Sequence, residues 1–260
     1  MPYENADAIV LKTVDFSETS LILTLFSREF GKIRAIAKGG RRLKGPFESA
    51  LDILSQIRVT FIRKNTDALD LLTEAKLQKR FYPTEKNYGG LYAAYYVVSL
   101  LNDALGDYEP AAALFDRTAA ALNTFADGQQ VQRSLVRFEW QLLETLGYLP
   151  TLRQCAECGT TVNWDTTKPI TFGLLSGGVL CEECETYQPQ RIHVSPETLR
   201  MIEQVCGDNE NWQSVPIAKR SMGETRALLS RYFSCILERP PKMQRYFGII
   251  QRNDHDMNLQ

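Results

Sequence analysis

Apolar and polar residues alternate along the first third of the chain, and this pattern predicts β-strands. Short apolar stretches are separated by polar or glycine-containing turns. The expected strands span about residues 8–14, 19–27, 32–38, 54–63 and 69–75. A long Gly- and Lys/Arg-rich connection, 39–47, separates the third strand from the fourth. Five short strands at this spacing predict a small closed barrel and not an α/β sheet.

Beyond about residue 83 the apolar spacing changes to intervals of three and four, which predicts helices. The expected helices span about 91–105, 114–125, 131–146 and 217–238. A further helix is expected from Pro196, because Ser195 is a favourable N-cap and proline suits the first helical position. Pro240 and Pro241 are expected to end the last helix. The pattern therefore predicts an α+β chain with more than one domain.

Four cysteines interrupt the helical part as two CxxC pairs. They are Cys155, Cys158, Cys181 and Cys184. Each CxxC turn can present two thiolates from one tight loop, and four thiolates at the corners of a tetrahedron suit one Zn²⁺ ion. Between the pairs, apolar stretches flank the turn-like Ser176, Gly177 and Gly178. This arrangement predicts a structural zinc site, or a relict of one, on a short two-stranded ribbon.

Other interpretations of the cysteines are weaker. Disulfides would require an oxidising compartment, and the N-terminal segment lacks the pattern of an export signal. A thioredoxin-like site needs a single CxxC in a βαβ context. Four thiolates leave no open position for catalysis, and neither His193 nor His255 lies in the HxE motif of a zinc deaminase. Cys206 and Cys235, in apolar helical stretches, are expected to be small buried residues.

Charge is distributed unevenly, although the net charge is only −1. Residues 1–80 contain fourteen Lys and Arg against ten Asp and Glu, whereas the other 180 contain sixteen against twenty-one. Between Arg28 and Lys44 there are seven cations and one anion. A surface that binds phosphates needs local positive potential. A nucleic-acid-binding surface is therefore expected within the first eighty residues.

Strand alternation predicts that the third strand has one charged face and one buried face. Lys32, Arg34 and Lys38 share a face, while Ile33, Ala35 and Ala37 occupy the other. The following loop adds three more cations: Arg41, Arg42 and Lys44. These six residues are the predicted DNA-binding residues, because such a surface can follow the phosphates of a single strand. A merely solvated face is the alternative. Phe47, Phe61 and Phe81 are candidate stacking residues, although core positions suit them better.

Several segments, taken in order, resemble the RecO family of recombination mediators. They are 19–26 followed by Gly31 and Lys32, 37–42 followed by Phe47, 172–181, and 239–247. The resemblance covers essentially the whole chain. It implies an OB-fold DNA-binding domain over 1–80, a helical domain over 81–150 and 188–250, and an inserted zinc ribbon over 151–187 with one Zn²⁺.

The same resemblance implies a function in DNA repair and homologous recombination by the RecF pathway. Family members bind and anneal single-stranded DNA, bind double-stranded DNA, and assist loading of the RecA recombinase. Implied partners are a RecR-like protein, the tail of single-strand-binding protein and, indirectly, RecA and RecF. The expected location is the cytoplasm, at the nucleoid, without a membrane segment.

Two other classes compete with this prediction. One is a zinc-ribbon scaffold that binds protein partners without contacting DNA. The other is a metal-dependent nuclease or hydrolase, for which the sequence offers no acidic or histidine cluster. No phosphate-binding loop of the GxxxxGK[ST] type and no GxSxG motif occurs. The sequence therefore predicts a protein that is not an enzyme.

Overall fold

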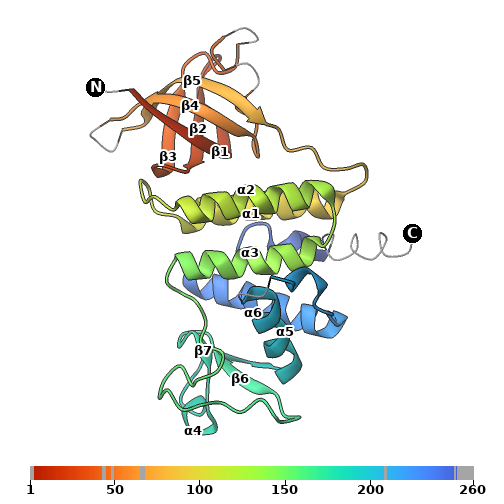
Figure 1. Ribbon diagram of the computed structural model, residues 1–260. Helices are drawn as coiled ribbons and strands as arrows, with labels where there is room; N and C mark the ends of the chain where they lie inside the picture. Colours follow the sequence, from red (N-terminus) through yellow and green to blue (C-terminus); the bar gives the residue numbers. More distant parts are fainter. Residues whose placement is uncertain are drawn as a thin grey trace. The chain divides into compact units, whose positions relative to one another are not determined.

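The structure is a computed structural model that describes residues 3–42, 45–47, 50–64, 68–207, 210–248 and 250. It contains two compact units (Figure 1). Unit 1 comprises Met1–Gln132 and Arg245–Gln260, and unit 2 comprises Arg133–Gln244. The chain thus leaves unit 1, forms unit 2 and returns. The domain boundaries expected at residues 80, 150 and 187 stay predictions.

Unit 1 begins with a closed five-stranded barrel. Its strands are β1 (Tyr3–Asp15), β2 (Leu21–Ser27), β3 (Gly31–Ala37), β4 (Gln56–Ile62) and β5 (Asp70–Lys79). They close in the order β1-β2-β3-β5-β4, with β1 antiparallel to both β2 and β4 and with β3 parallel to β5. All five predicted strands and the closure of the barrel are confirmed.

The barrel interior is filled by the residues that alternation assigned to it. Ile33, Ala35 and Ala37 of β3 are completely buried or nearly so. Of the three aromatic residues considered above, Phe47 and Phe61 belong to this core and Phe81 is half-buried. Phe47 and Phe61 are therefore not available for stacking on a ligand.

Two helices, α1 (Tyr88–Ala104) and α2 (Ala112–Asp127), pack against each other and belong to unit 1 together with the barrel (Figure 1). Phe26 of β2 meets Phe115 of α2 edge to face, with 5.7 Å between ring centroids. Gly31 has a φ of +73°, and a Cβ there would collide with the backbone of Glu109. Only glycine allows the first residue of β3 to approach the segment before α2 so closely.

The returning C-terminal segment also packs on α1. Tyr246 stacks on Tyr92 with ring centroids 5.0 Å apart, and Phe247 meets Tyr96 edge to face at 4.8 Å. These contacts attach residues 245–247 to unit 1.

Unit 2 combines helices with a small sheet. Its helices are α3 (Val131–Thr145, whose first two residues precede the boundary), α4 (Glu182–Glu185), α5 (Pro196–Cys206) and α6 (Lys219–Ile236). The sheet has the order β7-β6-β8, with β6 at Ile170–Gly173, β7 at Gly178–Val179 and β8 at Arg191–Val194. Ser195 caps α5 as predicted, accepting a hydrogen bond from the Thr198 backbone. The sequence predicted two strands here, and β8 is the third.

A buried ion pair joins two helices of unit 2. Arg226 of α6 donates to Glu139 of α3, and both side chains are almost completely excluded from solvent. Short 3-10 helices cover Trp212–Ser214 and Gln244–Tyr246. Of the helices within the described residues, none combines the length and the apolarity that crossing a bilayer requires.

Candidate metal centre and nucleic-acid interface

The first CxxC pair lies in a tight hairpin. The backbone N–H of Cys155 donates to the carbonyl of Thr160 at 2.7 Å, and the N–H of Gly159 donates to the carbonyl of Cys155 at 2.9 Å. Gly159 has a φ of +75°, a conformation that glycine adopts without strain. The hairpin therefore turns both thiols of this pair toward one point.

The second pair is placed by β7 and α4. Cys181 is the N-cap of α4, and Cys184 lies inside that helix. The N–H of Ala156 donates to the carbonyl of Val179 at 2.9 Å, which ties the first hairpin to the strand that leads into Cys181. This bond brings the two CxxC pairs together.

The four sulfurs fit a tetrahedral metal site. All lie within 4.8 Å of one another, and the sulfurs of Cys158 and Cys181 are 3.7 Å apart. Zn–S bonds of about 2.3 Å place neighbouring sulfurs of a tetrahedron about 3.8 Å apart. All six cysteines are free thiols. The prediction that the two pairs converge is confirmed, and the described residues contain no other His, Cys, Asp or Glu group of this kind.

The surroundings of the thiols favour thiolates at the first pair. Burial raises the pKa of Cys155, but backbone N–H groups of Cys158, Cys181 and Glu157 outweigh it and lower the pKa to about 6. Hydrogen bonds with Thr160 lower the pKa of Cys158. A hydrogen bond with Cys181 raises the pKa of Cys184. Because metals bind the thiolate, the chemistry of the donor set suits Zn²⁺.

The second candidate site is a surface of the barrel that contains most of the predicted DNA-binding residues. Arg34 projects from β3 opposite Thr24 of β2, and Lys38 and Arg42 belong to the turn after β3; all three cations are exposed. None of them forms an ion pair with another described residue. We call Arg34, Lys38 and Arg42 the open cations. Lys44 lies outside the described residues.

Lys32 differs from its neighbours on the charged face. Its ammonium donates to the carbonyls of Leu105 and Asn102 at the C-terminal end of α1 and lies 3.3 Å from Asp107. Its side chain is only 14% exposed. The expectation that Lys32 faces solvent is therefore wrong. A cation at a helix C-terminus satisfies free carbonyls and complements the helix dipole, which explains its position.

Arg41 connects two loops of the barrel. Its guanidinium lies 3.3 Å from the carboxylate of Asp15 and donates to the carbonyl of Ser17 at 3.3 Å. Its backbone N–H donates to the carbonyl of Thr19 at 3.1 Å. Arg41 therefore holds the loop between β1 and β2 beside the turn that carries Lys38 and Arg42.

The sequence interpretation missed Phe16 in that β1–β2 loop. Phe16 is 61% exposed, and neighbouring Val14 is 43% exposed. In the sequence the neighbouring Asp15, Ser17 and Glu18 indicate a polar turn, and the phenylalanine lies among them. A large apolar residue inside a polar turn was the signal that could have identified it.

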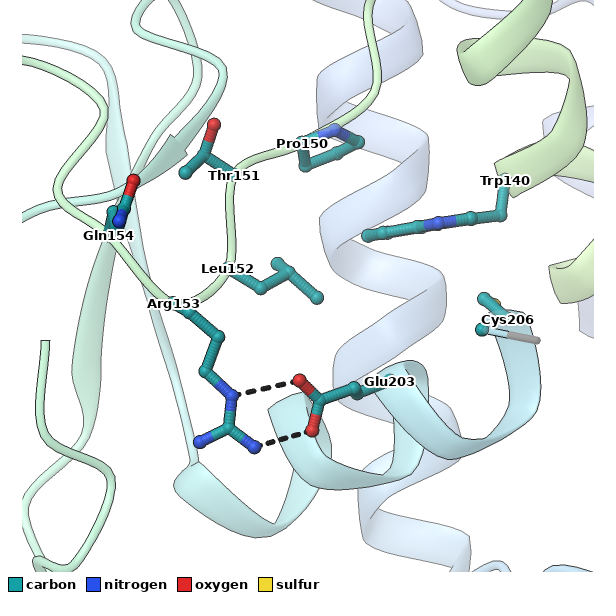
Figure 2. Close-up of a pocket in the computed structure, with 9 residues that line it drawn as sticks. Trp140, Pro150, Thr151, Leu152, Arg153, Gln154, Glu203 and Cys206 are labelled. Carbon is teal, nitrogen blue, oxygen red and sulfur yellow. Dashed lines mark hydrogen bonds and ion pairs between the residues drawn. The ribbon is translucent and has the colours of Figure 1, made fainter. Parts of the chain in front are cut away.

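Unit 2 also has a hollow of about 340 Å³, shown in Figure 2. Trp140, Leu152 and Cys206 line its apolar side. At its rim, Arg153 forms a two-point ion pair with Glu203 of α5 at 2.8 and 2.5 Å. The guanidinium also lies 3.7 Å from the centre of the Trp164 ring. Since Arg153 lies two positions before Cys155, it connects the cysteine hairpin to α5.

The sequence predicted that the two cysteines outside the cluster, Cys206 and Cys235, are buried. Both are instead half-buried. Burial raises the pKa of Cys206. Cys235 lies 3.8 Å from the side-chain oxygen of Gln190. Neither belongs to the metal cluster.

Known protein families match both the part of the chain that forms the barrel and the part that contains the cysteine cluster. Residues 1–81 match the family model "Recombination protein O N terminal", and residues 85–245 match "Recombination protein O C terminal". DNA repair protein RecO of Rhodopirellula baltica is 36% identical over 92% of this chain and 97% of the relative. DNA repair protein RecO of Syntrophus aciditrophicus is 27% identical over 95% of each chain, and that of Desulforamulus reducens is likewise 27% identical over 95% of each.

Proposed function

Since this chain belongs to the RecO family of DNA repair proteins, we propose that it is a recombination mediator of the RecF pathway. It binds and anneals single-stranded DNA and assists loading of the recombinase. The observation that carries this proposal is the set of open cations on the barrel, Arg34, Lys38 and Arg42. Exposed cations without ion-pair partners can neutralise phosphates without first breaking an internal contact.

We interpret the barrel as an OB-fold, whose β2–β3 face and β1–β2 loop are common binding surfaces for single strands. The open cations lie on β3 and on the turn that follows it. Annealing is then stoichiometric and not enzymatic. The protein reduces the repulsion between two strands, and base pairing supplies the free energy. Arg41 has a carboxylate partner and contributes less, and Lys32 belongs to the contact with α1.

We further propose one structural Zn²⁺ per chain, held by Cys155, Cys158, Cys181 and Cys184. The fit of the sulfur spacing to a tetrahedral site supports this assignment. Four thiolates complete the coordination of zinc, so the ion would supply folding free energy to the ribbon at residues 151–187 and no catalysis.

Partners follow from the family and belong to the proposal. They are double-stranded DNA, a RecR-like protein, the tail of single-strand-binding protein and, through these, RecA and RecF. The work of such a protein would take place at nucleoid DNA. The hollow lined by Trp140 and Leu152 favours a second function, a protein-binding scaffold, because apolar concave surfaces of this kind suit a partner's side chain.

The decisive experiment replaces all three open cations by alanine. Each phosphate neutralised on a single strand contributes about −0.7 to the slope of log affinity against log salt concentration. The triple variant should therefore bind every base sequence more weakly and lose about two units of that slope. Fluorescence anisotropy with a labelled oligonucleotide at several salt concentrations measures both quantities.

The matched control replaces three exposed cations of unit 2, Lys168, Lys219 and Arg231, so that the net charge changes equally. This control should keep the slope and almost all of the affinity. A folded triple variant with unchanged affinity and slope would refute the assignment of the DNA surface. A wild-type protein that does not bind bare oligonucleotide would instead favour the scaffold.

A further inference from the structure

The β1–β2 loop presents an aromatic ring on a fixed backbone. The N–H groups of Phe16 and Ser17 donate to the carbonyl of Ser20 at 3.0 and 3.3 Å. The N–H of Ser20 donates to the hydroxyl of Ser17 at 3.2 Å. Although the loop is ordered by these bonds, the ring of Phe16 is 61% exposed. Phenylalanine has no polar atom to gain from water, so its exposure costs free energy that a ligand covering the ring would recover.

Strand register places this loop beside the open cations. Leu21, the first residue of β2, is paired with Asp15 of β1 on one side and with Ala37 of β3 on the other. The loop that follows Asp15 and the turn that follows Ala37 therefore lie at the same end of the barrel. Arg41 connects the two segments directly, by its ion pair with Asp15 and its hydrogen bond to the carbonyl of Ser17.

The combination of ring and charge selects the ligand. An exposed aromatic ring beside cations on a small barrel suits a single strand, whose bases stack while its phosphates follow the positive charge. A duplex keeps its bases stacked on each other, so it offers the ring no free base. Among the described residues of the barrel, Tyr3 is the other strongly exposed aromatic, and it pairs with Ile62 at the opposite end of β1.

We propose that Phe16 stacks on an unpaired base of the strand whose phosphates are bound by Arg34, Lys38 and Arg42. The proposal rests on the proposed function, which it extends by naming the base-contacting residue. It gives the surface a preference for single-stranded over double-stranded DNA that charge alone does not provide.

The test compares Phe16→Ala with Tyr3→Ala as the matched loss of an exposed aromatic. Loss of one base–aromatic stack weakens binding by about fivefold to 150-fold. Phe16→Ala should therefore bind a labelled oligothymidine at least about fivefold more weakly, with an unchanged salt slope, and should bind duplex as the wild type does. Tyr3→Ala should match the wild type on both. The wild type should bind an oligonucleotide with abasic positions more weakly than the intact one. Phe16→Ala should bind both oligonucleotides with the same affinity.

A second variant gives a direct signal. The three natural tryptophans, Trp140, Trp164 and Trp212, all lie in unit 2, so Phe16→Trp adds the first tryptophan to unit 1. Its fluorescence should fall when the oligonucleotide is added. If the Phe16 variants bind like the wild type while the variant without open cations loses binding, the stacking proposal is wrong and the proposed function stands. If the wild type itself does not bind the strand, both are wrong.

Discussion

At the scale of single residues, Glu224 of α6 fixes the first turn of α5. One carboxylate oxygen accepts hydrogen bonds from the backbone N–H and hydroxyl of Ser195 at 2.9 and 2.6 Å, and from the hydroxyl of Thr198 at 2.8 Å. The other oxygen lies 3.0 Å from Arg220. Burial raises the pKa of Glu224, but these partners outweigh it and lower the pKa to about 2.

Because this pKa lies below the value of about 4.3 for a carboxyl in an unfolded chain, the ionised form stabilises the folded unit. The stabilisation is complete above the unfolded pKa and is lost as pH falls toward 2. Glu224→Gln should lower the free energy of unfolding by about 1–2 kcal/mol at pH 7, less than the full shift implies because water screens the carboxylate.

Urea unfolding followed by tryptophan fluorescence reports on unit 2, where all three tryptophans lie. The difference between wild type and Glu224→Gln should shrink from pH 7 to pH 3. Glu210→Gln, an exposed control in the same unit, should change little at either pH. A difference that is the same at both pH values would contradict the assigned role of the charge.

The sequence predicted side-chain direction well within one strand and poorly between distant segments. Alternation placed Ile33 inside and Arg34 outside, because neighbouring residues of a strand point to opposite sides. It placed Lys32 outside as well, since nothing near it in sequence reveals that the carbonyls of Leu105 lie within its reach. The exposure of Phe16 was not predicted for a related reason. The exposure of a loop side chain depends on which distant segments cover the loop.

At the scale of elements, the start of β3 and the segment before α2 are held together by a close backbone approach at Gly31. The collision of an added Cβ with Glu109 comes in addition to the cost of a positive φ. Gly31→Ala should therefore destabilise unit 1 by about 3 kcal/mol or more, the sum of backbone strain and displaced packing.

Gly39→Ala is the matched control, because Gly39 also has a positive φ of +79° while its Cβ would make only an ordinary contact with Arg42. This variant should lose about 1–2 kcal/mol. Chemical denaturation followed by circular dichroism measures both. Equal losses would mean that the approach to Glu109 does not constrain the fold.

Elements with strong local patterns were predicted closely, and β8 was not. The helix start at Pro196 was recognisable from Ser195 and the proline. β8 has four residues and pairs with β6, which lies well before it in sequence. Such a short strand carries too little alternation to be detected, because its extended conformation depends on the distant partner.

At the scale of the whole molecule, the two units should respond differently to removal of a metal. The cysteine hairpin has little apolar core of its own, so bound zinc would supply much of its folding free energy. The purified reduced protein should contain about one equivalent of zinc per chain. Chelation, or Cys158→Ser, should disturb Trp164, whose ring lies under Arg153 at the edge of the ribbon, and should leave oligonucleotide binding by unit 1 intact.

Elemental analysis, tryptophan fluorescence and anisotropy test the three parts of this prediction. Cys235→Ser, which lies outside the cluster, should keep the metal and the fluorescence. Metal-free protein with four free cysteine thiols in the cluster and an unchanged tryptophan spectrum would refute a zinc-dependent ribbon.

The convergence of the two CxxC pairs was predictable from the sequence, because their spacing is itself a metal-binding pattern. The assignment of α1 and α2 to the same unit as the barrel was not predictable, because it depends on contacts between distant segments, such as Phe26 with Phe115.

The return of the chain to unit 1 has a consequence for synthesis on the ribosome. Tyr246 and Phe247, which pack on Tyr92 and Tyr96 of α1, are translated only after every residue of unit 2. Until they emerge, Tyr92 and Tyr96 of α1 lack these two ring contacts. Unit 1 begins translation first, yet it acquires its last packing contacts after unit 2 has had the opportunity to fold.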